Sequence, residues 1–145
     1  MQLYEAMNPE SNFRERLTER DCEAGLTDAQ CSDLDRSEIY ERIRRVVGKT
    51  PLIRTELAHG NVMLQKDETA NPTETHYDRV YGELLSKLEQ EGRIRPGDIL
   101  LEATTGSAGV AFAWMARKLG YKSVIFVPSF VPQPRISLLQ EMADE

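Results

Sequence analysis

A run of small and hydroxyl-bearing residues, from Thr104 to Gly109, is the stretch of this sequence best suited to holding a ligand. The apolar residues before it, 99–103, predict a buried strand. The residues after it, 110–119, are apolar on nearly every side, which predicts a buried helix. A turn between them presents backbone N–H groups and hydroxyls at the helix N-terminus, where a phosphate or a carboxylate binds. The alternative is a tight turn whose residues are small only because they pack closely.

Nucleotide binding by the same turn has weaker support. The two glycines of the turn lack the spacing of the dinucleotide-binding fingerprint. The strand predicted over 122–127 is followed by Pro128 and Ser129 rather than by an acidic residue that would bind a ribose. A nucleotide is therefore the least favoured ligand for this turn.

Histidines and cysteines do not form a metal-binding pattern. His59 and His76 each stand alone, far in sequence from Cys22 and Cys31, so no metal site is predicted. The N-terminus lacks a basic start followed by an apolar stretch, so no secretory signal is predicted and the cytoplasm is the expected location. Without a secretory context, two free thiols are expected rather than a disulfide.

The net charge of −6 lies entirely in the N-terminal region. Residues 1–40 hold ten acidic and four basic side chains, and residues 41–145 hold fourteen of each. An acidic segment repels nucleic acid and anionic membranes, and no basic block elsewhere compensates for it. No run of residues is long and apolar enough to span a bilayer. Neither nucleic acid nor a membrane is therefore an expected partner.

Residues 1–38 are predicted to be an acidic extension, separate from an α/β domain over 39–145. The extension has few large apolar residues, so it must dock on the rest of the chain or stay loose. Ser11 or Asn12 is a candidate cap for a short helix ending at Arg20. Thr27, with Gln30 three residues later, forms a capping-box pattern for a second helix.

The first part of the domain is predicted to contain a helix, a hairpin and a second helix. The first helix begins at Ser37 and is ended by Gly48. Two strands around a Gly-Asn turn, 52–57 and 62–66, predict the hairpin. The second helix begins at Asp78, and its predicted apolar face consists of Val80, Tyr81, Leu84, Leu85 and Leu88.

Strands and helices alternate from Asp78 onward, which predicts a parallel sheet with right-handed crossovers. Its two clear strands are 99–103 and 122–127, and a helix over 135–142 follows them. Two parallel strands cannot form a sheet covered on both faces. Either the earlier strands join this sheet, or a three-layer α/β architecture is incomplete in this chain.

Three motifs follow one another in this domain: VGKTPL from Val47, NPTETHYDR from Asn71 and EATTGSAG from Glu102. Their order and spacing resemble the N-terminal part of the fold-type II enzymes that use pyridoxal phosphate (PLP). This group contains cysteine synthase, threonine synthase and cystathionine β-synthase. The resemblance runs from about Ile39 to the C-terminus. It implies an α/β fold of this group, PLP as cofactor, and elimination or replacement at the β-carbon of an amino acid.

The second motif departs from the family at its reactive position. There the family has a lysine that forms a Schiff base with PLP and later moves the proton at the substrate α-carbon, whereas this sequence has Tyr77. A phenol cannot form an imine but can donate a hydrogen bond or transfer a proton, so Tyr77 is a candidate catalytic residue only in a changed role. The alternative is an aromatic residue packed at a helix start. Glu74 stands where a glycine is usual, which adds a charge near the expected cofactor site.

The resemblance implies that the third motif grips the α-carboxylate of an amino acid with hydroxyls and backbone N–H groups. The corresponding carboxylate-binding positions are Thr104, Thr105, Gly106, Ala108 and Gly109. Ser107 replaces an asparagine that contacts the PLP ring oxygen in the family, so it is the candidate cofactor-binding residue, with a shorter reach. Ala108 replaces a threonine or a histidine.

Family members are longer, and their second half supplies the glycine-rich loop that holds the PLP phosphate. The 145 residues contain no counterpart of that loop. Two functions stay open: a PLP-dependent lyase or transferase that needs the missing half from elsewhere, and a non-catalytic relative that binds a partner enzyme. We expect no PLP-dependent turnover from this chain alone. The incomplete sheet predicts association with a second copy or with a complementary subunit.

Overall fold

Two short helices at the N-terminal end pack on the rest of the chain. The computed structural model describes residues 13–143. Helix α2 covers Phe13–Ala24, and α3 covers Asp28–Asp33 with the predicted capping box between Thr27 and Gln30. α2 continues one turn beyond its predicted end at Arg20, because the residue that can leave the helix with a left-handed φ of 66° is Gly25. The candidate caps Ser11 and Asn12 lie outside the described residues.

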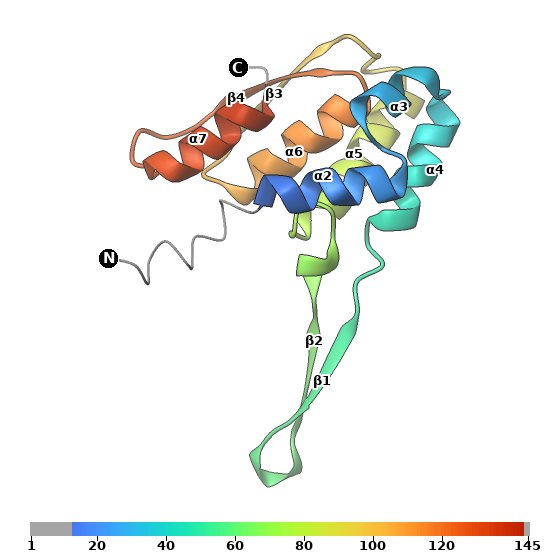
Figure 1. Cartoon of the computed structure of the whole chain (residues 1–145). Helices are drawn as coiled ribbons and strands as arrows, with labels where there is room; N and C mark the ends of the chain where they lie inside the picture. The colour runs from blue at the N-terminus through green and yellow to red at the C-terminus, as the bar shows by residue number, and fades with distance from the viewer. Residues whose placement is uncertain (1–12, 144–145) are drawn as a thin grey trace.

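The next helix leads into a hairpin that projects from the body of the molecule (Figure 1). Helix α4 covers Arg36–Val46. Its capping box uses Asp35 and Glu38, so the predicted start at Ser37 was one residue late. Strand β1 (Leu52–Glu56) and strand β2 (Val62–Lys66) form the predicted antiparallel hairpin, joined by the 3-10 helix η1 (Ala58–Gly60).

The remaining elements form the predicted parallel unit. The 3-10 helix η2 covers Glu68–Ala70 and α5 covers Tyr77–Gln90; then follow β3 (Ile99–Ala103), α6 (Ser107–Lys118), β4 (Lys122–Phe126) and α7 (Gln133–Met142). β3 and β4 pair in parallel, with Leu100 opposite Ser123. Within residues 13–143 the hairpin does not join them, so the parallel sheet has two strands.

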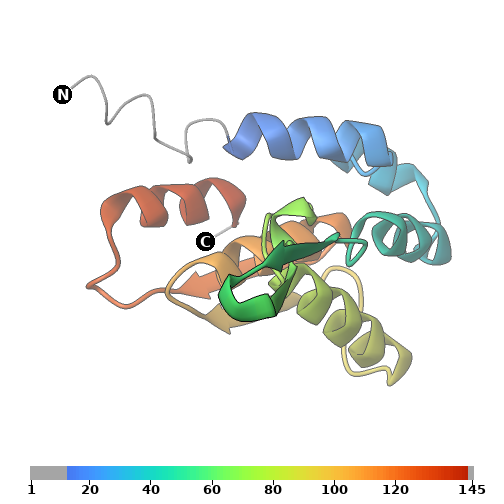
Figure 2. The ribbon, with the colours of Figure 1, turned by 90° about the horizontal axis from the view of Figure 1, so that it is seen from below.

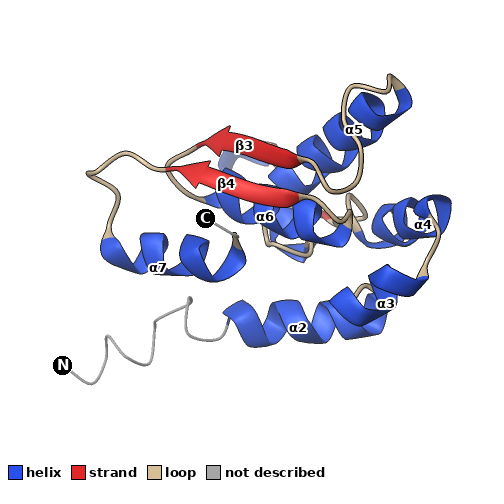
Figure 3. Cartoon of the chain, turned by 90° about the horizontal axis from the view of Figure 1, so that it is seen from above, coloured by secondary structure: helices blue, strands red, loops and turns tan. Residues whose placement is uncertain are grey.

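Helix α6 is the centre of the molecule. The sheet lies on one side of it, and α2 and α3 lie on the opposite side (Figures 2 and 3). This position explains why α6 is apolar on nearly every side: every residue from Gly109 to Ala116 is buried. Trp114 is only 2% exposed and donates its indole N–H to the carboxylate of Asp21 on α2, at 2.9 Å. The N-terminal helices therefore share one hydrophobic core with the α/β unit.

The outer face of the sheet is open, which contradicts the prediction of a buried strand over 99–103. Ile99, Leu101 and Phe126 are 60%, 65% and 61% exposed, because no element of the described residues covers that face. Val80 and Leu84 of α5 are also exposed, so the predicted apolar face of this helix is only partly buried. The buried residues of α5 are Asp78, Tyr81, Leu85 and Ser86.

Both cysteines are free thiols, as expected. Cys22 is exposed, whereas Cys31 is buried, and burial raises the pKa of its thiol. No helix within residues 13–143 has both the length and the apolar composition needed to cross a membrane. The same residues contain no group of three histidine, cysteine or acidic side chains placed to hold a metal ion.

Candidate functional site

The turn between β3 and α6 presents the N-terminus of a buried helix. Gly106 is the N-cap of α6, and no side chain caps the helix. The Gly109 N–H donates to the carbonyl oxygen of Gly106 at 2.9 Å, so the N–H groups of Ser107 and Ala108 are the ones directed at the space in front of the helix, at the positive end of its dipole. The turn is closed by Thr104, whose Oγ1 accepts a hydrogen bond from the Gly106 N–H at 3.2 Å. Thr105 and Ser107 are exposed, and Ala108 is half-buried.

Gly109 is a packing residue. A Cβ atom at this position would lie 2.7 Å from Cγ2 of Thr104 and 2.9 Å from Cδ2 of Leu139. Only glycine allows the first turn of α6 to approach both the turn and α7 this closely. Close packing therefore accounts for the final glycine of the third motif, while the rest of the turn is available to a ligand.

A cavity of about 220 Å³ lies beside Ser107. It brings the N-terminus of α6 together with Thr73, Glu74 and Thr75 of the second motif. Phe13, Val110, Arg135 and Leu138 complete its lining. The cavity wall thus carries one guanidinium, one carboxylate and two threonines, and neither Tyr77 nor any lysine is among its lining residues.

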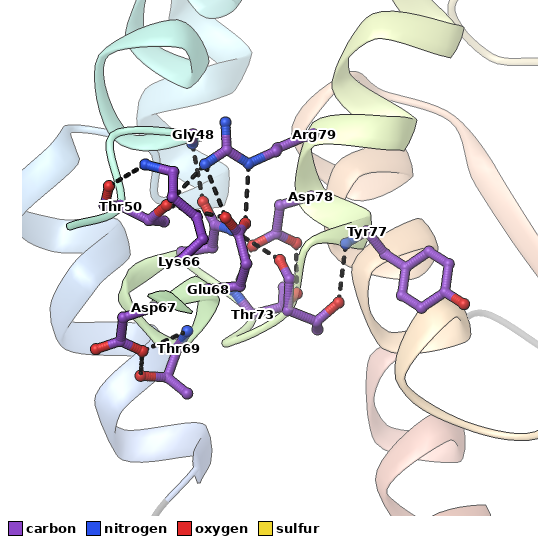
Figure 4. A network of polar contacts seen from close by, with 12 residues as sticks. Gly48, Thr50, Lys66, Asp67, Glu68, Thr69, Thr73, Tyr77, Asp78 and Arg79 are labelled. Carbon is purple, nitrogen blue, oxygen red and sulfur yellow. Dashed lines mark hydrogen bonds and ion pairs between the residues drawn. The ribbon is translucent and has the colours of Figure 1, made fainter. Parts of the chain in front are cut away.

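Tyr77 is the first residue of α5 and packs against neighbouring aromatic rings. Its ring centroid lies 4.2 Å from that of His76 and 6.4 Å from that of Tyr81. Its backbone N–H donates to Oγ1 of Thr75 at 2.9 Å. Figure 4 shows the ring directed away from the polar network that surrounds the start of α5. Tyr77 therefore follows the cavity-lining residues 73–75 in the chain, but its side chain packs in an aromatic cluster instead of lining the cavity.

Glu74 has a left-handed backbone, with a φ of 62°. This conformation favours glycine, the residue that is usual at this position in the resembling family. Arg16 of α2 holds the carboxylate with two hydrogen bonds, of 2.8 Å from Nε and 3.2 Å from Nη2. Nη2 of Arg20 lies 3.4 Å from the same carboxylate. Helix α2 therefore reaches over the loop of the second motif.

A network of polar side chains joins the first two motifs (Figure 4). Arg79 donates to both carboxylate oxygens of Glu68, at 2.8 and 2.9 Å, and to Oγ1 of Thr50 at 2.7 Å. These hydrogen bonds from Arg79 lower the pKa of Glu68 to about 2, so Glu68 is ionised at neutral pH. Lys66 donates to the carbonyl oxygen of Thr50. Thr50 belongs to the first motif and Arg79 to the second, but the sequence did not predict that these residues bind Glu68 and one another.

Asn71 and Asp78 fix the loop that leads to Tyr77. Asn71 is fully buried; its Oδ1 accepts from the Gly48 N–H at 2.8 Å, and its Nδ2 donates to the carbonyl oxygen of Thr75 at 2.9 Å. Asp78 is also fully buried and accepts hydrogen bonds from the backbone N–H and the hydroxyl of Thr73. Burial raises the pKa of Asp78 to about 6. The loop is thus rigidly held from both sides.

Comparisons with known proteins give the same family as the three motifs. Residues 43–145 match the sequence model of the family described as pyridoxal-phosphate dependent enzyme. Cysteine synthase B of Pseudomonas aeruginosa is 40% identical over 92 residues, which are 61% of this chain and 31% of that protein. Cysteine synthase of Dictyostelium discoideum is 33% identical over 112 residues, 75% of this chain and 30% of that protein.

Solved structures agree with the sequence comparison. The crystal structure of a hydrogen sulfide-producing enzyme from Fusobacterium nucleatum superimposes with a TM-score of 0.68 at 29% sequence identity. The superposition covers 74% of this chain and 33% of that one. This chain therefore spans about a third of the length of these three proteins. The fold expected from the motifs is confirmed, and the chain belongs to the pyridoxal-phosphate dependent enzyme family.

Proposed function

We propose that this chain is a binding member of its family, which holds the carboxylate of a small amino acid at the N-terminus of α6 without a lysine-linked cofactor. One observation carries the proposal. Tyr77 stands at the reactive position, and the cavity between the second and third motifs has no lysine in its lining.

PLP is the cofactor that membership of the family implies. Its covalent attachment needs a primary amine in the site, and the five lysines of the chain lie elsewhere. Lys118 is buried in ion pairs with Asp21 and Asp28, at 2.7 and 2.8 Å. Lys66 is bonded to Thr50, and the remaining three are exposed and do not line the cavity. The residues present do not fit covalently bound PLP, and no step of a PLP reaction is assigned to this chain.

The carboxylate part of the proposal is supported by three features around Ser107. The first turn of α6 presents N–H groups that no side chain caps. Ser107 and Arg135 both line the adjoining cavity, so a hydroxyl and a guanidinium stand beside those N–H groups. The cavity volume of about 220 Å³ suits a small amino acid rather than a larger ligand.

A titration followed by amide NMR tests this proposal. L-Serine is added to the ¹⁵N-labelled chain, with L-serinamide as the matched ligand that lacks the carboxylate. We expect saturable shifts at Ser107 and Ala108 with serine and none with serinamide. Ser107→Pro removes an N–H at the first helical position, where proline is tolerated, and is expected to weaken binding about tenfold. Ser107→Ala, which removes only the hydroxyl, should weaken it less. Equal responses to serine and serinamide would contradict carboxylate binding.

A second candidate function is β-elimination or β-replacement in an assembly where another polypeptide supplies the amine and the phosphate-binding loop. The 40% identity to cysteine synthase B favours it. The open sheet face, with Ile99, Leu101 and Phe126 exposed, supports association with a second copy or with such a subunit. Sedimentation velocity of the chain, with and without a full-length cysteine synthase, tests this candidate. Leu101→Lys should reduce any association that uses the face.

A further inference from the structure

A second cavity, of about 340 Å³, lies between α2, the C-terminal end of α4 and the loop around η2. Its apolar wall is formed by Leu26, Val46, Pro72 and Trp114. The volume is in the range of small-molecule sites, in which an apolar wall commonly carries a few polar groups. This cavity is separate from the one beside Ser107, with which it shares no lining residue.

Three basic side chains border this second cavity: Arg20, Arg45 and Lys49. Lys49 is exposed and has no ion-pair partner within residues 13–143. Arg45 is exposed and is paired with Glu41 at 2.5 Å, on the surface of α4, where such a pair contributes little. The cavity therefore combines an apolar wall with positive charge.

The acidic residues of the same cavity do not cancel this charge. Asp21 lies 2.7 Å from the ammonium group of Lys118 and accepts the indole N–H of Trp114, so its charge is compensated from inside the core. Glu23 is exposed and lines the same cavity, where its one carboxylate stands against the three basic groups. A ligand that fits this arrangement has an apolar body facing Trp114 and a negative group facing Lys49 and Arg45.

We propose that this cavity binds a small organic carboxylate with an apolar body, independently of the site beside Ser107. Arg20 lies between this cavity and the one beside Ser107. Its Nη1 donates to the carbonyl oxygens of Asn71 and Pro72, at 2.9 and 3.0 Å, and its Nη2 lies 3.4 Å from Glu74. Arg20 therefore lines the second cavity and also holds the loop of the second motif.

The single tryptophan provides the test, because its indole N–H gives one NMR signal that needs no further assignment. The probe is phenylacetate, added to the ¹⁵N-labelled chain, and phenylacetamide is its neutral counterpart. We expect the Trp114 indole signal to shift saturably with phenylacetate and to respond at least about tenfold more weakly to phenylacetamide.

Matched variants locate the response. Lys49→Gln combined with Arg45→Gln removes the positive charge from exposed positions and is expected to weaken phenylacetate binding about tenfold. Lys87→Gln, an exposed lysine on α5 outside the cavity, should leave it unchanged. An unshifted indole signal, an equal response to phenylacetamide, or equal affinities of the double variant and the Lys87 variant would each overturn the proposal. None of these outcomes depends on serine binding at Ser107.

Discussion

At the scale of single residues, Glu74 shows how a residue with a side chain is held in a backbone conformation that favours glycine. Its φ of 62° is a conformation that costs a residue with a side chain about 1 kcal/mol relative to glycine. The bidentate pairing with Arg16, assisted by Arg20, offsets this cost. The Glu74 side chain also lines the cavity beside Ser107. Through these ion pairs, Glu74 connects helix α2 to the loop of the second motif.

Two substitutions of Glu74 separate the backbone effect from the ion pair. Glu74→Gly and Glu74→Ala both remove the contacts with Arg16 and Arg20, but only alanine keeps the unfavourable left-handed φ. We expect the glycine variant to be more stable than the alanine variant by about 1 kcal/mol. Urea denaturation of the two variants measures the difference. Equal stabilities would mean that the backbone at this position is not strained.

Asp78 predicts a pH dependence of stability. Its pKa is raised to about 6 in the folded protein from 3.8 in a solvated reference, so the folded state binds the proton more tightly than the unfolded state. The stability that this residue contributes is therefore fully present below about pH 4 and is lost as the pH rises through about 6.

Asp78→Asn removes this titration and keeps a group that can bond to Thr73. Between pH 4 and 7, we expect the stability of the variant relative to the wild type to rise by up to about 3 kcal/mol. Urea denaturation at several pH values measures it, and a constant difference would contradict it.

At the scale of elements, the position of α6 decides the rest of the fold. The parallel sheet packs on one side of α6 and the N-terminal helices pack on the other. Together they bury this helix. The turn at its N-terminus must therefore pack tightly on one side while it leaves N–H groups accessible on the other. Gly109 provides the packing, and Ser107 and Ala108 provide the N–H groups at the start of the helix.

Gly109→Ala tests this packing. The new methyl group would lie within 3 Å of both Thr104 and Leu139, and we expect a loss of stability of about 1–3 kcal/mol. Gly82→Ala is the matched control, because it also adds a methyl group to a helical glycine, 3.3 Å from the flexible end of Met115. The control should be neutral or stabilising, since alanine is the better helix former. Thermal unfolding of both variants gives the comparison, and equal losses would show that the contact with Thr104 and Leu139 is not special.

Most elements were predictable from the sequence because each has a local signal. The Thr27 capping box, the antiparallel hairpin and the parallel pairing of β3 and β4 all follow from residue type and spacing. The start of α4 was predicted at Ser37, whereas the capping box uses Asp35 and Glu38 three residues later. The incomplete sheet predicted open apolar surface, but not that Ile99, Leu101, Val80 and Leu84 would form it, because an apolar residue does not show whether another layer covers it. The network of Glu68, Arg79 and Thr50 depends on contacts distant in sequence.

At the scale of the whole molecule, the N-terminal helices share one hydrophobic core with the α/β unit. Phe13, Leu17 and Leu26 are buried in the same hydrophobic cluster as Trp114. Lys118 is 4% exposed and pairs with Asp21 and Asp28, which come from α2 and the start of α3. Removing one partner from such a buried pair is costly, so these contacts favour a single arrangement of the two parts.

This arrangement predicts a cooperative effect of a change in α2. Leu17→Ala removes a buried side chain and should destabilise the whole molecule by about 2–4 kcal/mol, in a single transition followed by Trp114 fluorescence. Glu19→Ala, on the exposed side of the same helix, should change stability by less than about 0.5 kcal/mol. An unchanged unfolding midpoint in the Leu17 variant would show that α2 is not coupled to the core.

The central claim, that this family member forms no lysine-linked PLP, is tested most directly by chemical trapping. The purified chain is incubated with PLP and reduced with borohydride, and the products are analysed by intact mass and peptide mapping beside a Tyr77→Lys variant. We predict that the natural chain carries no adduct, or a partial label scattered over the exposed residues Lys49, Lys87 and Lys122. One stoichiometric adduct on a single lysine of the natural chain would contradict the account.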